Sequence, residues 1–367
     1  MKRHIMITAM TFLCGTIFAQ TTLTQVWRIN RSDDRDWFTS ASDRRVRSAK
    51  YSAATDHVTC ISRTETTATL VVLNASNGAN ISKNYLDPAI VTGGTFPVNM
   101  HGVDSAGVTY FSNLTLAANT TSFTIYRLAT ESAVPTLAFK DFIPALGATG
   151  RIGDTFDVSG SGTNTEIWCG TNIGAGPHLV KFTTTDGLTF TVASTLTASG
   201  GTWSVALGPP ARLGMSVLGT GADAEVWGDS SGVGLIPRKF DATSGAILDE
   251  VPIMLSYDGV TNTAPGLCPV GINSILGNKL IASTPGNFNA ATVPGSECGY
   301  VYNVNVVGAA AKVGNTVTLQ DGISTNADGT GTAFFDTNRN RVLFDVTNNS
   351  ISSHNILGSN VSDWNLF

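Results

Sequence analysis

The sequence predicts an all-β fold, a single β-propeller with six blades, and three observations lead to this prediction. Charged residues make up only 13% of the 367 residues, while Gly numbers 38. Short runs of β-branched and aromatic residues alternate with Gly, Asn, Asp and Ser, which is typical of strands joined by tight turns. A unit of four such runs recurs at intervals of roughly 50 to 60 residues, a spacing that fits irregular propeller blades.

The clearest unit spans residues 151 to 196. Its four β-type runs are Asp154 to Val158, Glu166 to Gly170, Leu179 to Thr183 and Thr189 to Leu196. Four antiparallel strands joined by tight loops form a twisted sheet of the size of one blade. A single blade cannot bury both of its faces, so we expect the units to form one cooperative ring.

Five further units are expected, with starts near Arg45, Phe96, Arg212, Pro265 and Asn326. The unit at Arg212 closely repeats the one at Arg151, with Trp227 in the place of Trp168. Seven blades are the alternative if the run from Trp203 to Gly208 begins a blade of its own.

The last unit has only three runs, and a lone β-type run near the N-terminus offers the fourth strand. We expect Leu23 to Ile29 to pair beside Ser350 to Leu357. This pairing would close the ring and leave no sheet edge inside it.

The first 19 residues have the pattern of a signal peptide. Basic Lys2 and Arg3 precede an apolar run from Ile5 to Phe18 and the small residue Ala19. We therefore expect a propeller domain over residues 20 to 358, a tail over 359 to 367, and export to the periplasm or the extracellular space. The absence of a second long apolar stretch predicts no membrane span, and the mature chain is expected to be a monomer.

The charge balance argues against nucleic acid as a partner. The formal net charge is −5, and loss of Lys2 and Arg3 with a signal peptide would change it to −7. Proteins that bind nucleic acid need the opposite sign on their surface.

Several segments resemble an exported bacterial family catalogued as domain of unknown function 4623. They read GGTFPVNMHGVDSAGVTYFSNLT, SFTIYRLA, GRIGDTFDVSGSGTNTEIW and NADGTGTAFFD, and the resemblance runs from about Leu23 to Leu357. It implies a propeller-like fold and an exported location. It implies no catalytic residues, because that family has none assigned.

The known catalytic and metal motifs give no lead. The sequence has no nucleophile elbow, zinc helix or phosphate loop, and the four histidines after the leader are scattered. We therefore predict no metal site and no cofactor. The oxygen-rich run from Asp336 to Asn340 is interpreted as a hairpin rather than a calcium loop. The segment from Thr184 to Phe190 resembles the Asp-box of sialidase-like propellers, a hairpin lock that lies away from active sites.

The cysteines suggest one disulfide. Cys60 and Cys169 occupy equivalent second runs of non-adjacent units, too far apart for a bond, and are interpreted as buried apolar residues. Cys268 and Cys298 belong to one unit, so we predict a disulfide between them. Its loop of roughly 30 residues would stabilise the fold by about 3 kcal/mol.

A candidate ligand site follows from position in the ring. The innermost strands of a propeller begin around the mouth of its central channel, where ligands usually bind. The residues expected there are Arg47, Asn99, His101, Arg151, Asp154, Arg212 and Asp328. Converging arginines suit carboxylate or sulfate groups. The alternative is that each arginine caps strand-end carbonyls or pairs with a neighbouring Asp.

These observations favour a non-catalytic exported propeller that binds an anionic glycan or a cell-surface protein at the channel mouth. One alternative is a carbohydrate-active lyase or hydrolase that uses His101 with an Arg and an Asp. Another is a structural protein of the envelope or cell surface. A catalytic site would need His101 within reach of a charged partner in a cleft.

Overall fold

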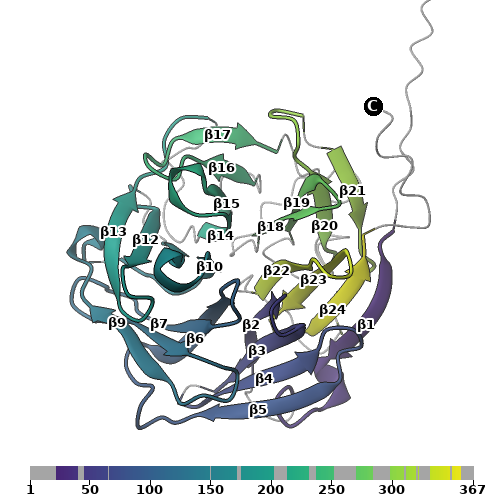
Figure 1. Ribbon diagram of the computed structural model, residues 1–367, viewed down its shortest axis with the longest axis horizontal. Coiled ribbons are helices and arrows are strands. Elements are labelled where there is room, and N and C mark those ends of the chain that lie inside the picture. Colours follow the sequence, from purple (N-terminus) through teal and green to yellow (C-terminus); the bar gives the residue numbers. More distant parts are fainter. Residues whose placement is uncertain are drawn as a thin grey trace, which may run out of the picture.

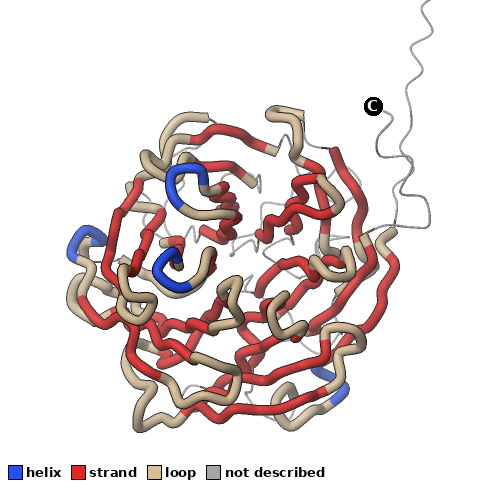
Figure 2. The backbone as a smooth tube through the Cα atoms, in the orientation of Figure 1, coloured by secondary structure: helices blue, strands red, loops and turns tan. Residues whose placement is uncertain are grey.

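The described chain forms a ring of six four-stranded antiparallel sheets, seen along its shortest axis in Figure 1. The computed structural model describes residues 22–39, 45–64, 66–148, 150–171, 175–201, 213–230, 237–251, 270–283, 298–309, 311–319, 321, 331–347 and 349–356. Figure 2 shows that strands make up the ring and that helical segments are short. The six-bladed prediction is confirmed, and the run from Trp203 to Gly208 lies outside the described residues.

Each of the first five blades is a meander in which the chain moves outward from the axis. Blade 1 contains β2 (Arg45–Ser52), β3 (His57–Arg63), β4 (Ala68–Asn74) and β5 (Asn80–Leu86). Blade 2 contains β6 (Phe96–Val103), β7 (Thr109–Leu114), β8 (Phe123–Leu128) and β9 (Thr136–Asp141). Blade 3 contains β10 (Asp157–Ser159), β11 (Glu166–Gly170), β12 (Leu179–Thr184) and β13 (Phe190–Leu196).

Blades 4 and 5 repeat this plan, and blade 6 takes its outermost strand from the N-terminus. Blade 4 contains β14 (Leu213–Leu218), β15 (Glu225–Ser230), β16 (Arg238–Phe240) and β17 (Ile247–Glu250). Blade 5 contains β18 (Val270–Ile275), β19 (Asn278–Ser283), β20 (Tyr300–Asn303) and β21 (Ala311–Asn315). Blade 6 contains β22 (Gly331–Asp336), β23 (Arg341–Val346), β24 (Ser350–Asn355) and the N-terminal β1 (Thr24–Asn30). Short 3₁₀ turns are η1 (Arg31–Asp33), η2 (Pro144–Leu146), η3 (Gly162–Asn164) and η4 (Gly221–Asp223).

The N-terminal strand closes the ring, as the sequence predicted. β1 pairs antiparallel with β24 from Thr24 opposite Asn355 to Asn30 opposite Ser350. The Trp27 indole donates to the carbonyl of Ala75 in blade 1 at 2.9 Å, so the closing strand also contacts the next blade.

The hydrophobic core is divided into six clusters of described residues, one between each pair of adjacent blades. Inner and middle strands are therefore buried on both faces, as in β7, where every residue is buried. Outer strands such as β5 are mostly exposed. Cys60 and Cys169 lie in two of these clusters as buried thiols, which confirms their interpretation as apolar residues.

Polar side chains connect the innermost strands around the axis. Thr332 Oγ1 bonds both the N–H and the carbonyl of Ala49, at 2.9 and 2.8 Å, and so joins blade 6 to blade 1. Ser48 Oγ accepts from the backbone N–H of His101 at 3.1 Å and joins blade 1 to blade 2. Each bond replaces a lost water contact of a buried backbone group, so the blades are held at fixed positions.

Three further junctions use a carboxylate, a hydroxyl or a close approach. Asp157 Oδ2 accepts from the backbone N–H of Val217 at 2.8 Å, which joins blades 3 and 4. Ser216 Oγ accepts from the N–H of Ile272 at 3.3 Å, which joins blades 4 and 5. Blades 5 and 6 approach at Gly271, where a Cβ would lie 2.1 Å from the Ala333 carbonyl oxygen. Only glycine fits there.

The two near-copy segments carry the same link between blades. Glu166 accepts from the N–H of Gly221 at 2.9 Å and pairs with Lys181 at 2.7 Å, so it joins blade 3 to blade 4. Glu225 holds the equivalent place and pairs with Lys279, so it joins blade 4 to blade 5. The repeated Glu-x-Trp pattern is therefore a structural feature of the ring.

The hairpin interpretations are confirmed. Asp186 accepts from the N–H groups of Leu188 and Thr189 at 2.7 and 2.8 Å, which closes the turn of the Asp-box-like segment. Asp336 accepts from the N–H of Arg339 at 3.1 Å in the turn between β22 and β23. None of the described helices has the length and apolar character needed to cross a membrane.

The predicted disulfide is not tested by the structure. Cys298 is half-buried before β20, and Cys268 lies outside the described residues. The pairing stays a prediction. The signal peptide and the C-terminal tail also lie outside the described residues.

Candidate functional site

Five of the seven predicted site residues are described, and they lie within or just before the innermost strands of blades 1 to 3. Arg47 is in β2, Asn99 and His101 are in β6, and Arg151 and Asp154 precede β10. Arg212 and Asp328 lie outside the described residues. The expectation that Arg47, Arg151 and Arg212 share one pocket therefore stays a prediction.

Arg151 is paired with Asp154, three residues along the chain. Its Nη2 donates to Asp154 Oδ1 at 2.7 Å, and its Nε donates to Oδ2 of the same carboxylate. This bidentate pair bends the chain before β10, which begins at Asp157 rather than at Asp154 as expected. The Arg151 side chain keeps 19% of its surface exposed, so it is accessible in part although its charge is balanced locally.

Arg47 is buried and lies at an irregularity in β2. The register shifts between Val46 and Ser48, which makes Arg47 an extra residue in the strand. Its positive charge acts on Asp345 of β23. Burial raises the pKa of Asp345 well above its ordinary value, and Arg47 opposes this shift only in part. Burial thus favours the uncharged form of Asp345.

A fourth arginine, which the sequence prediction missed, lies beside Asn99. Arg63 ends β3, donates from Nη2 to Asn99 Oδ1 at 3.0 Å, and places its guanidinium 3.7 Å from the Phe96 ring centre. Asn99 in turn donates to the Gly153 carbonyl at 2.6 Å. The only signal in the sequence was a basic residue at the end of the second run of the first unit.

His101 is fully buried and both of its ring nitrogens have partners. Ser48 Oγ lies 2.5 Å from Nδ1, and Thr59 Oγ1 lies 3.0 Å from Nε2. Burial, with a smaller effect from Lys50, lowers the pKa of His101 to about 3. The ring is therefore neutral near pH 7 and serves to join blades 1 and 2.

The axis itself is filled by a charged pair that crosses the ring. Lys50 of blade 1 donates to Asp157 Oδ1 of blade 3 at 2.7 Å, and both side chains are buried. A space of about 10 Å³ beside Lys50 is room for one water molecule. Among the described residues, no group of three or more His, Cys, Asp or Glu is placed to hold a metal ion.

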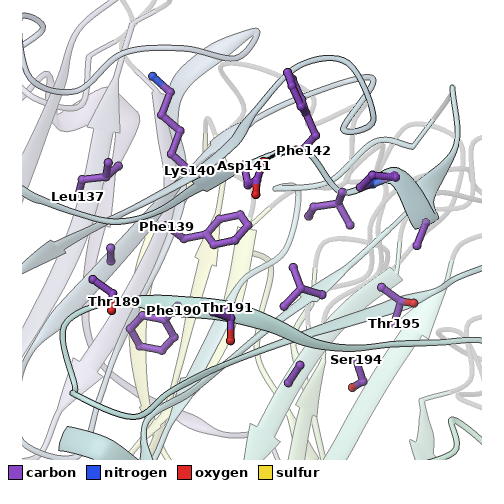
Figure 3. A pocket seen from close by; sticks show the side chains of 16 residues that line it. Leu137, Phe139, Lys140, Asp141, Phe142, Thr189, Phe190, Thr191, Ser194 and Thr195 are labelled. Carbon is purple, nitrogen blue, oxygen red and sulfur yellow. Dashed lines mark hydrogen bonds between the residues drawn. The ribbon is translucent and has the colours of Figure 1, made fainter.

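A larger cavity lies at the rim, between the outermost strands of blades 2 and 3. This rim groove has a volume of about 640 Å³ and is lined by residues 137–145 and 189–195. Phe139 extends from β9 into the space that faces β13 (Figure 3). The volume is within the usual range of small-molecule sites, roughly 300 to 1,000 Å³.

Comparison with known proteins supports the fold. The structure is similar to that of a DUF4623 family protein from Bacteroides eggerthii DSM 20697, with a TM-score of 0.54 and 16% identity over 92% of this chain and 77% of that chain. It is also similar to the GH93 α-L-arabinofuranosidase of Fusarium graminearum in complex with arabinobiose, with a TM-score of 0.51 and 10% identity over 91% of this chain and 97% of that chain.

The likeness is one of fold. At these identities it places the chain among β-propellers and, as the sequence resemblance implied, beside a DUF4623 protein. No family model and no curated protein matches the sequence.

Proposed function

We propose that this protein is a non-catalytic binding propeller that takes an anionic ligand where its innermost strands begin. The observation that carries this proposal is that Arg63 and the Arg151 segment both meet Asn99. Arg63 bonds the Asn99 side chain, and Asn99 bonds Gly153, two residues from Arg151. Arg63 of blade 1 is buried, whereas Arg151 before blade 3 keeps 19% of its side-chain surface exposed and is the group that a ligand would contact.

The charge of this face favours an anion. Asp154 balances Arg151, while burial favours the uncharged form of Asp345. The described side chains around Asn99 include two arginines, Arg63 and Arg151, and one carboxylate, Asp154, on a protein of net charge −5. Guanidinium forks match carboxylate and sulfate groups, so a uronic-acid or sulfated glycan is the ligand class that fits best. A local positive field would also speed the encounter with a polyanion.

The lyase or hydrolase alternative gains no support from His101. A general acid or base must reach the substrate, and this ring is buried with both nitrogens occupied. Export, proposed from residues 1 to 19, would place the protein where anionic polysaccharides and surface proteins occur.

The proposal is tested by binding of the purified chain without residues 1 to 19 to immobilised polygalacturonate and heparin, with dextran as the neutral polymer. The double variant Arg151→Gln with Asp154→Asn removes the pair without leaving either charge unbalanced. We expect it to weaken binding by about tenfold, the value of one lost charge-assisted contact. Lys140→Ala, which removes one positive charge at the rim, is the matched control. Equal binding of dextran, or no effect of the double variant, would overturn the proposal.

A further inference from the structure

The blade junctions differ at the rim in what covers them. Between blades 6 and 1, the segment from Arg31 to Thr39 buries Trp37 and Phe38 and pairs Asp36 with Lys83 of β5. Between blades 1 and 2, Asn84 of β5 donates to the carbonyls of Glu131 and Ala133 at 3.1 and 2.9 Å. In both places the chain covers its own outer strand.

The junction between blades 3 and 4 is covered by a segment that pairs with an outer strand through its backbone. Ser199 forms a parallel bridge with Ala246, and the N–H of Ile247 donates to the Ser199 carbonyl at 2.8 Å. An extended stretch of polypeptide therefore fits beside the outer strand of a blade in this ring. It uses backbone groups that an edge strand leaves unpaired.

The junction between blades 2 and 3 lacks such a cover among the described residues. The connecting segment after β9 turns back onto its own blade, where the N–H of Ile143 donates to the Ala118 carbonyl at 2.7 Å. The N–H of Ala118 donates to the carbonyl of Gly150 at 2.9 Å, which fixes this path. This segment lines the rim groove opposite β13, and among the described residues it makes no backbone hydrogen bond to that strand.

The lining of the rim groove suits an extended peptide. Phe139 and Phe190 form an apolar floor and are packed against the aromatic cluster of the junction. Leu137 and Phe142 are exposed by 52% and 47% and add apolar surface at the border of the groove. Thr191 and Ala193 are exposed on β13 beside them. Lys140 and Asp141 adjoin at one border, so their charges offset one another and favour an uncharged occupant.

We propose that the rim groove binds an extended, uncharged peptide segment of another protein by strand addition to β13. β9 and β13 have six and seven residues, so the groove accommodates a segment of about six residues. Alternate apolar side chains would contact the floor, while the backbone pairs with the open strand edge. The described chain has its ends at Thr22 and Ile356, beside blades 5 and 6 across the ring from the rim groove (Figure 1).

The experiment uses a fluorescein-labelled hexapeptide of sequence Thr-Val-Thr-Phe-Thr-Val with blocked ends and measures fluorescence anisotropy. Saturable binding is expected. The same peptide with N-methyl groups at alternate residues loses backbone donors and should bind at least about tenfold more weakly. Binding that is insensitive to N-methylation would exclude strand addition.

Site-directed variants locate the peptide. Ala193→Arg places a long charged side chain in the rim groove and should weaken binding at least about tenfold, since it occupies the space and adds an unpaired charge. Ser82→Arg makes the same change on exposed β5 and should have no effect. Leu137→Ser serves if Ala193→Arg does not fold. The proposal would be overturned if the peptide showed no saturable binding, or if the groove variants bound it as well as the wild type does. It would also be overturned if the groove bound an arabino-oligosaccharide in preference to the peptide.

Discussion

The axis of the ring and the rim groove between blades 2 and 3 use polar and apolar groups in opposite ways. At the axis, Lys50, Asp157 and the hydroxyl groups of the inner strands are buried and bonded across blades. The space described beside Lys50 measures about 10 Å³, whereas the rim groove holds about 640 Å³ beside exposed apolar side chains. The bonds at the axis thus fix the positions of the blades in the ring, whereas amino-acid substitutions at the rim groove should leave the fold intact.

The largest expected effect comes from opening the ring. Deletion of residues 20 to 30 removes β1, with its buried Trp27 and Ile29, and exposes the edge of β24. Loss of these two side chains alone costs about 5 kcal/mol or more. We expect the truncated chain to unfold at a much lower temperature, or not to fold, as measured by calorimetry. Thr24→Ala, an exposed change in the same strand, should leave the midpoint unchanged. A truncated chain that melts like the wild type would refute ring closure by β1.

The second effect compares a lysine at the axis with one at the rim. Lys50→Met leaves the buried Asp157 carboxylate without its cation and should lower the free energy of unfolding by about 3 to 5 kcal/mol. Lys140→Met at the rim should change it by less than about 0.5 kcal/mol. Denaturant titration measures both. Addition of Asp157→Asn to Lys50→Met should recover part of the loss, because no uncompensated charge then remains. Equal effects at the two lysines would contradict the comparison.

The third effect is a dependence of the free energy of unfolding on pH, and it originates at the buried histidines. Burial lowers the pKa of His101 to about 3 and that of His354 to about 4, from an ordinary value of 6.5. The folded state then binds fewer protons than the unfolded state below pH 6.5, so stability falls as the pH falls. Each histidine contributes at most about 1.4 kcal/mol per pH unit in this window. Unfolding titrations between pH 7 and 4.5 should show a shallower slope for His101→Asn. An unchanged slope would assign the acid sensitivity to other groups.

The blade pattern could be predicted from sequence because it rests on local signals. Turn residues such as Asp186 bond their own neighbours, and the near copies at Arg151 and Arg212 reveal the repeat. Closure of the ring by β1 was predicted because the last unit has only three β-type runs and a lone run lies near the N-terminus. The run from Glu166 to Gly170 was predicted with its observed bounds. These features depend on residues a few positions apart.

The chemistry of the site depended on partners that the sequence does not bring together. His101 is bound by Ser48, and Lys50 by Asp157, which are 53 and 107 residues apart. No local pattern distinguishes a histidine that joins two blades from one that faces a ligand. The rim groove was missed for a related reason, since it depends on the path that a connecting segment takes.

The strand that closes the ring also sets the order of folding. A ribosome makes β1 first and its partner β24 last, with some 320 residues between Asn30 and Ser350. At roughly 5 to 20 residues per second, β1 waits about 15 to 65 seconds before its hydrogen-bonding partner exists. Contacts of such long sequence separation are slow to form. Until then β1 has no partner strand, and the growing chain presents an unpaired strand edge that can pair with another molecule.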